Sequence, residues 1–392
     1  MPSNFSALQN YLSPLAPNFF PPDRYAPNQW GSKLRRYTNK GDMDGLETAQ
    51  IAVMGVLPTI NTDNDNDNNN NTAAADKVRP HLYELYNRET DYRIADIGNV
   101  QGGNTPHDTL HAISAVVEIL LRRKIIPIII GHEHYQTVGQ FWGHGMLEKP
   151  VSIILFDQKL DFGQKESELS AHSFLYKILH DPRLYHFTLA AYQRYLVNAD
   201  MIDTLEQLNF ECYNLGDVRK NVQEAEPMVR QMQMVSFDLS SLKYVYAPAA
   251  ADAGPNGLNG EDACSIMRYA GMSDYVSSLG LYGYCYQKDK DQQTARLLAQ
   301  MIWYFSDGFY NRKYDFPEID HKHFLQYIVH LKDSDHELRF LKSRKSDRWW
   351  MSVPAQGLPN EIAIVPCSYN DYQAACRDEI PERWLKAVLR YQ

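Results

Sequence analysis

Residues 151–162, VSIILFDQKLDF, decide the fold expected for this chain. The first six form a mainly apolar run rich in β-branched residues, which is typical of a buried strand rather than of a helix. Asp157 ends the run, and Asp161 follows four residues later. An unpaired buried charge is very costly, so carboxylates at the exit of a buried strand need a metal ion, a cationic side chain, or both. Lys159, between the two aspartates, indicates a mixture of these partners.

Strands and helices are predicted to alternate on both sides of this stretch. Residues 49–56 and 125–130 form apolar strands. Thr105, Pro106 and Asp108 give an intervening helix a capping residue, a proline in its first turn and an early acidic residue. Strands that are apolar on both faces and alternate with helices indicate a parallel sheet that is covered on both sides. The expected fold class is therefore α/β, a doubly wound parallel sheet in a three-layer αβα arrangement.

The chain of 392 residues is expected to form one α/β domain with an elaboration at each end. Residues 1–45, rich in proline, asparagine and aromatic residues, are predicted to wrap around the domain, which takes residues 46–339. Residues 340–392, with a final helix over 381–391, are expected to be an extension packed on the same domain. Segment 61–71 is almost entirely Asn and Asp, and it is interpreted as a solvated loop because it lacks the ligand spacing of a calcium loop.

Composition excludes several classes of function. The formal net charge of -9 argues against general binding to nucleic acids or anionic membranes. The five cysteines are odd in number and have no C-x-x-C spacing, which favours free thiols in a reducing compartment. The first residues do not have the pattern of a signal peptide, and the longest apolar run is too short to span a bilayer. We therefore expect a soluble, cytoplasmic protein with no nucleic-acid partner and no membrane partner.

Three predicted strands end in groups that can bind a metal, and ligands of doubly wound sheets gather at the carboxyl ends of the strands. The segments are GHEH at 131–134, DQKLD at 157–161 and SFDLS at 236–240. Together they resemble the strand-end motifs GGDHS, DAHxD and SxDxD of the ureohydrolase superfamily of arginase, agmatinase and formimidoylglutamase, which hold two manganese ions. The resemblance covers about residues 51–305, and the glycine-rich turn at 256–262 is similar to a turn of that family.

This resemblance implies a fold of the arginase type and a first metal site in this chain. Imidazole and carboxylate ligands have the chemistry that suits manganese. Asp157 and Asp238, which a second metal site would share, are expected to be catalytic together with Lys159. The metal ligands implied by the resemblance are His134, Asp157, Asp161 and Asp238.

Three positions depart from the family pattern. Lys159 and Ser240 stand where the second site has its own histidine and aspartate, and Gly283 stands where the family has a substrate-binding glutamate. A protonated lysine cannot bind a metal, but its ammonium can occupy the place of a cation. Our hypothesis is that Lys159 replaces the second metal and pairs with Asp157 and Asp238, which would keep the buried cluster neutral. A polar cluster that holds no metal is the alternative.

Two functions remain open at the level of the sequence. One is hydrolysis of a C–N bond in a small amidine-type substrate, closest to formimidoylglutamase, with one manganese ion at most. The other is a catalytically inactive protein of the same fold that binds a ligand or a partner in the old pocket. These three departures, together with His132 and Glu133 in place of the Gly and Asp of the family's first motif, favour the second function, and the intact first ligand set favours the first. The resemblance also implies a homo-oligomer, whereas the substrate and the metal occupancy are left undetermined.

Overall fold

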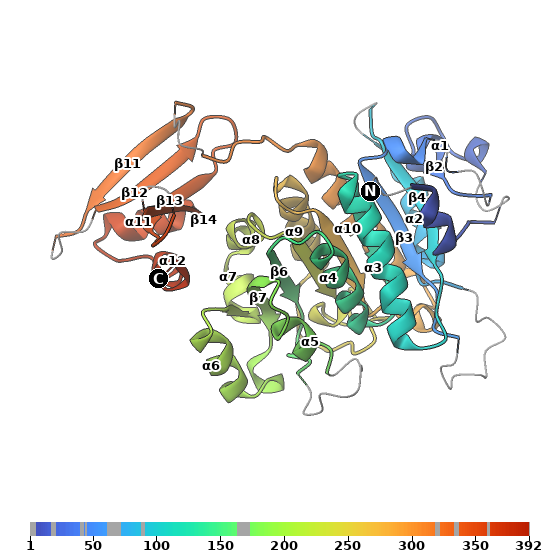
Figure 1. The fold of residues 1–392 in the computed structure, drawn as a ribbon, viewed down its shortest axis with the longest axis horizontal. Coiled ribbons are helices and arrows are strands. Elements are labelled where there is room, and N and C mark those ends of the chain that lie inside the picture. Colours follow the sequence, from blue (N-terminus) through green and yellow to red (C-terminus); the bar gives the residue numbers. More distant parts are fainter. Residues whose placement is uncertain are drawn as a thin grey trace.

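The computed structural model describes the following residues of the chain: 5–16, 21–39, 43, 45–60, 72–87, 91–162, 173–317, 322–332, 337–358 and 361–391. The segment 61–71, predicted to be a loop, lies outside them. Two sheets are present in the described part, a large and mainly parallel sheet and a smaller antiparallel sheet (Figure 1).

The strands of the large sheet are β1 (Leu12–Ser13), β2 (Arg35–Arg36), β3 (Ile51–Val56), β4 (Ile94–Val100), β5 (Ile126–Ile130), β6 (Val151–Phe156), β7 (Leu184–Tyr192), β8 (Glu211–Asn214), β9 (Met234–Asp238) and β10 (Ser278–Tyr282). Their order is β1-β4-β3-β5-β10-β9-β6-β7-β8, with β2 paired to β4. β1 is antiparallel to β4, whereas the core pairs from β4 to β8 are parallel. The predicted doubly wound sheet is confirmed.

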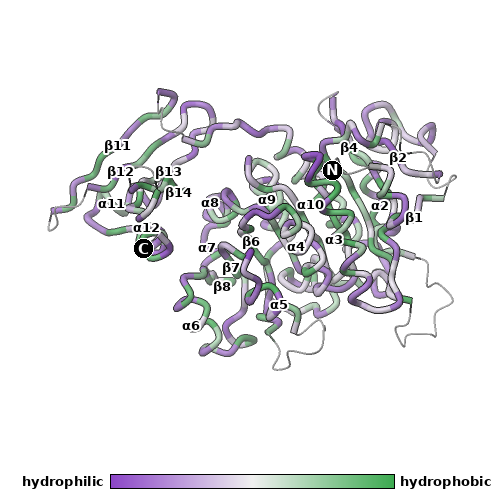
Figure 2. The backbone as a smooth tube through the Cα atoms, in the orientation of Figure 1, coloured by the Kyte–Doolittle hydropathy of each residue, from purple (hydrophilic) through white to green (hydrophobic). Residues whose placement is uncertain are grey.

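The helices of this domain are α1 (Trp30–Lys33), α2 (Ala75–Glu84), α3 (Pro106–Arg122), α4 (Thr137–Gly145), α5 (Leu175–Leu179), α6 (Ala199–Gln207), α7 (Leu215–Lys220), α8 (Ala225–Val229), α9 (Gly260–Met272) and α10 (Gln293–Tyr310). One hydrophobic cluster joins α2, α9 and α10 to one face of the sheet, and another joins α3, α4 and α5 to the other face. Hydrophobic stretches accordingly run along the central strands and α3 (Figure 2). This is the predicted three-layer αβα arrangement.

Local signals in the sequence position several of these elements. All six residues of β6 are buried, as the apolar run at its position predicts. Helix α3 begins with the predicted capping arrangement, in which the Thr105 side chain accepts a hydrogen bond from the backbone N–H of Asp108 and the Asp108 carboxylate accepts one from the backbone N–H of Thr105. These caps satisfy N–H groups that the first turn of a helix leaves without partners.

The smaller sheet belongs to residues 322–391, which we call the C-terminal unit. It contains β11 (Phe324–His330), β12 (Glu337–Ser343), β13 (Trp349–Pro354) and β14 (Ile362–Cys367), followed by α11 (Tyr369–Cys376) and α12 (Glu382–Tyr391). It has a hydrophobic core of its own, and it forms the orange and red part of Figure 1. The sequence predicted α12 but not the sheet, and the boundary predicted between residues 339 and 340 falls inside β12.

Arginines of the C-terminal unit pair with glutamates of the α/β domain. Arg348 Nε lies 3.1 Å from Glu226 Oε1, and Arg383 Nη2 lies 3.2 Å from Glu224 Oε2. Arg390 forms an ion pair with Glu211. Ion pairs therefore help attach the unit to the domain, together with hydrogen bonds such as those from Gln231 Nε2 to the Ile364 carbonyl oxygen and from Asn209 Nδ2 to the Leu389 carbonyl oxygen. None of the helices in the described residues combines the length and the hydropathy that crossing a membrane requires.

Two buried histidines are expected to make the fold sensitive to acid. Burial lowers the pKa of His144, whose Nε2 lies 2.7 Å from Ser278 Oγ, to about 4, and burial likewise lowers the pKa of His186 to about 4. In the unfolded chain a histidine has a pKa of about 6.5. Each group therefore contributes stability that is present above pH ~6.5 and is lost as the pH falls towards 4, by up to about 3 kcal/mol.

We expect the variant His144→Gln to lose less stability than the unmodified protein between pH 6.5 and 4. Urea denaturation followed at several pH values measures this difference. The exposed His180 gives the matched control, because His180→Gln should leave the dependence on pH unchanged. Equal dependence in the two variants would contradict the proposed role of His144.

Candidate metal centre

The predicted metal ligands lie at the carboxyl ends of neighbouring parallel strands. β5, β10, β9 and β6 are consecutive in the large sheet. His134 opens the short 3-10 helix η4 (His134–Gln136) after β5, Asp157 follows β6, and Asp238 is the last residue of β9. The sheet thereby brings together side chains from three separate segments of the chain.

His134 is the centre of this cluster. Its Nδ1 lies 3.1 Å from Asp157 Oδ2, 3.2 Å from Asp238 Oδ2 and 3.6 Å from Asp161 Oδ2. All four side chains are largely or fully buried, and the ligand atoms of His134, Asp157 and Asp238 lie within 4.8 Å of one another. The four predicted ligands thus meet in one place, and three of them form a group compact enough to hold an ion.

Two atoms of the cluster have the chemistry and the surroundings of free metal ligands. His134 Nδ1 and Asp157 Oδ2 are buried and face each other at 3.1 Å, but neither has the geometry of a hydrogen bond to the other or to any other described residue. On the other side of the ring, His134 Nε2 lies 3.3 Å from Ser236 Oγ, which is 2.7 Å from Thr137 Oγ1. A second nitrogen held by the protein is common among metal-binding histidines, because it fixes the orientation of the ring. Buried polar atoms without partners usually have an explanation, and a cation would supply it here.

The electrostatics of the cluster also favour a cation. Burial alone would lower the pKa of His134, but the surrounding carboxylates raise it well above its ordinary value. Burial raises the pKa of Asp238 to about 6 and also raises that of Asp157, because charged carboxylates are costly in this environment. The group of residues therefore gains stability from a positive charge, which a proton on His134 or a divalent ion can provide.

Ser240 donates hydrogen bonds to the Oδ1 atoms of Asp157 and Asp238. Its hydroxyl donates a hydrogen bond to Asp157 Oδ1 at 3.0 Å, and its backbone N–H donates one to Asp238 Oδ1 at 2.6 Å. The backbone N–H of Lys159 also donates to Asp157 Oδ1, at 3.1 Å. Each aspartate thus directs Oδ2 towards His134, while hydrogen bonds engage Oδ1.

The ion-pair partner of Lys159 differs from the predicted ones. Its ammonium forms an ion pair with Asp252 rather than with Asp157 and Asp238. Burial would lower the pKa of Lys159, but the Asp252 carboxylate raises it. The side chain of Asp252 is 58% exposed, so the ammonium remains near water in this pair and avoids the desolvation that a place inside the cluster would require. The predicted pairing inside the cluster is therefore wrong for this structure.

Gly283, directly after β10, has a backbone conformation that excludes most side chains. Its φ is +81°, in the left-handed region that favours glycine, and a Cβ at this position would lie 3.0 Å from Asp238 Oδ2. A side chain here would press on the Asp238 carboxylate. The backbone conformation at Gly283 therefore disfavours the glutamate that the family has at this position. The difference from the family concerns the backbone as well as the side chain.

The cluster opens into a cavity of about 500 Å³. Asp252, an exposed residue of its lining, was not predicted from the sequence, because no motif surrounds that residue. The contact between His132, which lines the cavity, and Cys285 was not predicted either. His132 Nδ1 lies 2.9 Å from the Tyr284 carbonyl oxygen, Nε2 lies 4.0 Å from Cys285 Sγ, and the neighbouring Cys285 raises the pKa of His132 to about 9. The lining consists of His132, Glu133, His134, Asp157, Lys159, Asp161, Asp238, Ser240, Ala251, Asp252 and Gly283.

Comparisons with known proteins agree with this arrangement of the fold. The arginase family model matches residues 41–306. No curated protein matches this sequence. A formiminoglutamase from Trypanosoma cruzi with Mn²⁺ has a similar fold, with a TM-score of 0.61 and 19% identity over 69% of this chain and 97% of that one.

Two further solved structures are similar. The agmatine ureohydrolase of Thermoplasma volcanium has a TM-score of 0.55 and 20% identity, over 69% of this chain and 92% of that one. The formimidoylglutamase from Bacillus subtilis has a TM-score of 0.59 and 16% identity, over 67% of this chain and 88% of that one. At these identities the similarity concerns the fold alone. The family match ends before β11, so the C-terminal unit lies outside it.

Proposed function

This chain belongs to the arginase family, and we propose that it hydrolyses a C–N bond in a small amidine-type substrate, in the manner of formimidoylglutamase, with a single manganese ion. The observation that carries this proposal is the buried group of His134, Asp157 and Asp238, whose ligand atoms converge within 4.8 Å while His134 Nδ1 and Asp157 Oδ2, 3.1 Å apart, do not meet the geometry of a hydrogen bond. A protein that had lost every use for a cation would gain stability by giving these buried atoms partners.

The donor set fits manganese, because imidazole and carboxylate groups suit this ion. His134, Asp157, Asp161 and Asp238 would hold it, and the bound ion would supply a Lewis acid and an activated water. Asp157 and Asp238 keep their Oδ2 atoms turned towards the cavity through the hydrogen bonds that Ser240 and Lys159 make to Oδ1.

We place Lys159 in contact with the substrate and not in the position of a second ion. Its side chain lines the cavity, is 31% exposed and is paired with the exposed Asp252. There it can stabilise negative charge on the substrate. The same lysine and Ser240 occupy the positions of the second site's own ligands, which supports a stoichiometry of one ion per chain.

A non-catalytic binding protein is the second candidate, and Gly283 favours it. A cationic amidine would find no carboxylate at this position, and the positive φ together with the tight 3.0 Å approach of a Cβ to Asp238 Oδ2 disfavours a side chain there. On this alternative the cavity binds a ligand or a partner without turnover. Family membership also supports a homo-oligomer in the cytoplasm under either candidate.

The test measures both the metal content and the turnover of the same purified protein. The full chain is purified with manganese, its metal content is measured by mass spectrometry, and formiminoglutamate, agmatine and arginine are supplied in turn. We expect about one ion per chain and hydrolysis of formiminoglutamate that is absent without the metal. One ion without turnover of any of the three substrates would favour the second candidate, and no ion would contradict the metal site itself.

A double variant tests the stoichiometry separately. Lys159→His combined with Ser240→Asp returns to the chain the two ligand types that the family has at these positions. We expect the metal content to rise from about one to about two ions per chain. The single variant Ser240→Ala, which adds no ligand, is the matched control and should remain at one.

A further inference from the structure

An open cavity lies at the carboxyl ends of β7 and β8, on the same edge of the large sheet as the metal centre. Tyr192 ends β7 and Asn214 ends β8, and both line the cavity together with residues that follow the two strands. Its volume is about 290 Å³, and it shares no lining residue with the cavity of the metal centre. Ligands of doubly wound sheets gather at this edge, so the position suits a separate binding site.

The backbone at the end of β7 directs side chains into this cavity. Ala191 is fully buried and has a φ of +65°, in the left-handed region that residues other than glycine rarely adopt. The pairing of β7 with β8 shifts its register between Ala190 and Tyr192, as it does at a β-bulge. Bulges next to functional sites re-aim nearby side chains, and the side chains that follow here are Gln193 and Arg194 of the lining.

Two arginines give this cavity its charge, and both are available to a ligand. Arg194 and Arg219 are exposed, and within the described part of the chain neither takes part in an ion pair or a side-chain hydrogen bond. None of the described residues that line the cavity is acidic, so their formal charge is +2. The Asp217 carboxylate lies outside the lining and caps α7, where it accepts a hydrogen bond from the backbone N–H of Asn214 at 3.3 Å.

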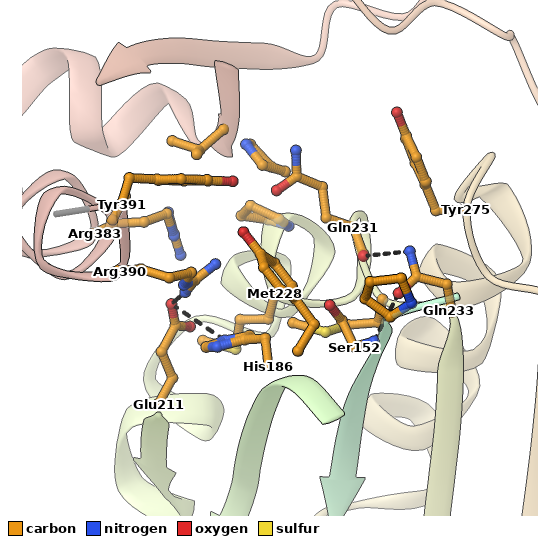
Figure 3. A pocket seen from close by; sticks show the side chains of 17 residues that line it. Ser152, His186, Glu211, Met228, Gln231, Gln233, Tyr275, Arg383, Arg390 and Tyr391 are labelled. Atoms are coloured by element: carbon orange, nitrogen blue, oxygen red, sulfur yellow. Dashed lines mark hydrogen bonds and ion pairs between the residues drawn. The ribbon is translucent and has the colours of Figure 1, made fainter. Parts of the chain in front are cut away.

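A second cavity, at the amino ends of the strands, differs in this respect. Figure 3 shows it beneath α12, where Arg390 pairs with Glu211 at the start of β8. Arg383, the other arginine of its lining, pairs with Glu224. Because these arginines already have carboxylate partners, the cavity beneath α12 offers little net charge to an anion. The arginines at the carboxyl ends of β7 and β8 are not compensated in this way.

The floor between these two arginines is held by hydrogen bonds. Gln193 is buried, its backbone N–H donates to the Gln158 carbonyl oxygen at 2.9 Å, and its Nε2 donates to the Asn256 carbonyl oxygen at 3.1 Å. The Tyr195 hydroxyl donates to Gln193 Oε1. Ordering side chains is a main cost of binding, and a floor that is already fixed leaves chiefly the two arginine side chains to be ordered.

We propose that this cavity binds a phosphate dianion, as inorganic phosphate or as a small phosphate monoester, between Arg194 and Arg219. A phosphate monoester carries a charge of about −1.5 to −2 at neutral pH and presents three acceptor oxygens. Guanidinium groups bind phosphate through paired N–H donors, and a dianion balances both arginines, whereas a single carboxylate balances one. The site is separate from the metal centre, so its occupancy does not depend on the hydrolysis proposed above.

Phenyl phosphate and phenyl sulfate are the main probes, because they share size and shape and differ in charge. The full chain, purified without added manganese, is titrated with each compound by calorimetry. We expect phenyl phosphate to bind at least about fivefold more tightly than phenyl sulfate. Inorganic phosphate distinguishes the two sources of the dianion: an affinity equal to that of phenyl phosphate identifies the free anion, and weaker binding identifies a monoester.

Two outcomes of these titrations would overturn the proposal. One is that neither phosphate binds, and the other is that phenyl sulfate binds as tightly as phenyl phosphate. Succinate, a dianion with two separate carboxylates, is the further comparison, and tighter binding of succinate would contradict the preference for phosphate.

Three variants locate the binding in this cavity. Arg194→Gln and Arg219→Gln each remove one guanidinium from an exposed side chain, and we expect each to weaken phenyl phosphate at least about fivefold. Arg296→Gln is the matched control, because it changes an exposed arginine of α10 that lines a different cavity, and it should leave the affinity unchanged. Unchanged affinity in the first two variants would place the phosphate elsewhere, for example near Lys159, and reject the site.

Discussion

Asp157→Asn is expected to reduce bound manganese from about one ion per chain to nearly none. The substitution removes a charged ligand from a group in which His134 Nδ1 lies 3.1 Å from Asp157 Oδ2. We expect at least a 100-fold loss of affinity, which corresponds to about 2.8 kcal/mol. Calorimetric titration with manganese, supported by metal content after gel filtration, measures the change.

The same variant should not destabilise the metal-free protein. Burial raises the pKa of Asp157, so its negative charge is unfavourable in the fold when no ion is bound. Asp252→Asn is the matched control, since Asp252 pairs with Lys159 in the cavity lining and is not among the proposed ligands. Normal manganese affinity in Asp157→Asn, or equal losses in both variants, would show that the ion is not held where we place it.

Arg79→Leu is expected to lower the free energy of unfolding by about 3–5 kcal/mol. The Arg79 side chain on α2 is fully buried, and its Nε and Nη2 lie 2.7 Å and 3.0 Å from the two carboxylate oxygens of Asp96 on β4. Its Nη1 also donates to Asn99 Oδ1 at 2.8 Å. Loss of the guanidinium would leave the Asp96 charge buried without its main partner. Chemical denaturation measures the difference.

Two comparisons separate this effect from a general cost of losing an arginine. Arg122→Leu changes a half-exposed arginine on α3 that pairs with Glu118, and it should alter stability by less than about 1 kcal/mol. The addition of Asp96→Asn to Arg79→Leu should restore part of the lost stability, because the orphaned charge is then removed. A small loss in Arg79→Leu alone would mean that the pair is not needed to join α2 to the sheet.

The large sheet and the meeting of the four predicted metal ligands could be predicted because both depend on local patterns. The apolar run of β6, the capping residues of α3 and the polar groups after β5, β6 and β9 are each readable within a few residues. Parallel strands then force their carboxyl ends to one edge, so the pattern alone brings His134 close to Asp157 and Asp238.

The C-terminal sheet was not predicted: its first two strands do not carry a comparably clear signal, and the apolar runs of β13 and β14 were not recognised as strands. β11 alternates between intermediate and exposed residues, and charged residues interrupt β12, so neither resembles the buried strands of the domain. Its core forms only when these strands pack against α11 and α12. Each strand of this sheet pairs with the next one in the sequence, but its burial depends on packing against the two helices that follow.

The sequence by itself determined which chemical groups stand at the strand ends, since residue type and strand periodicity are local properties. Only the tertiary structure decided that Lys159 pairs with Asp252, that Gly283 leaves room for the Asp238 carboxylate, and that α12 closes a second cavity over the amino ends of the strands. A long flexible side chain can reach several partners, and a backbone angle or a cavity depends on every segment that surrounds it. For that reason no short pattern could specify them.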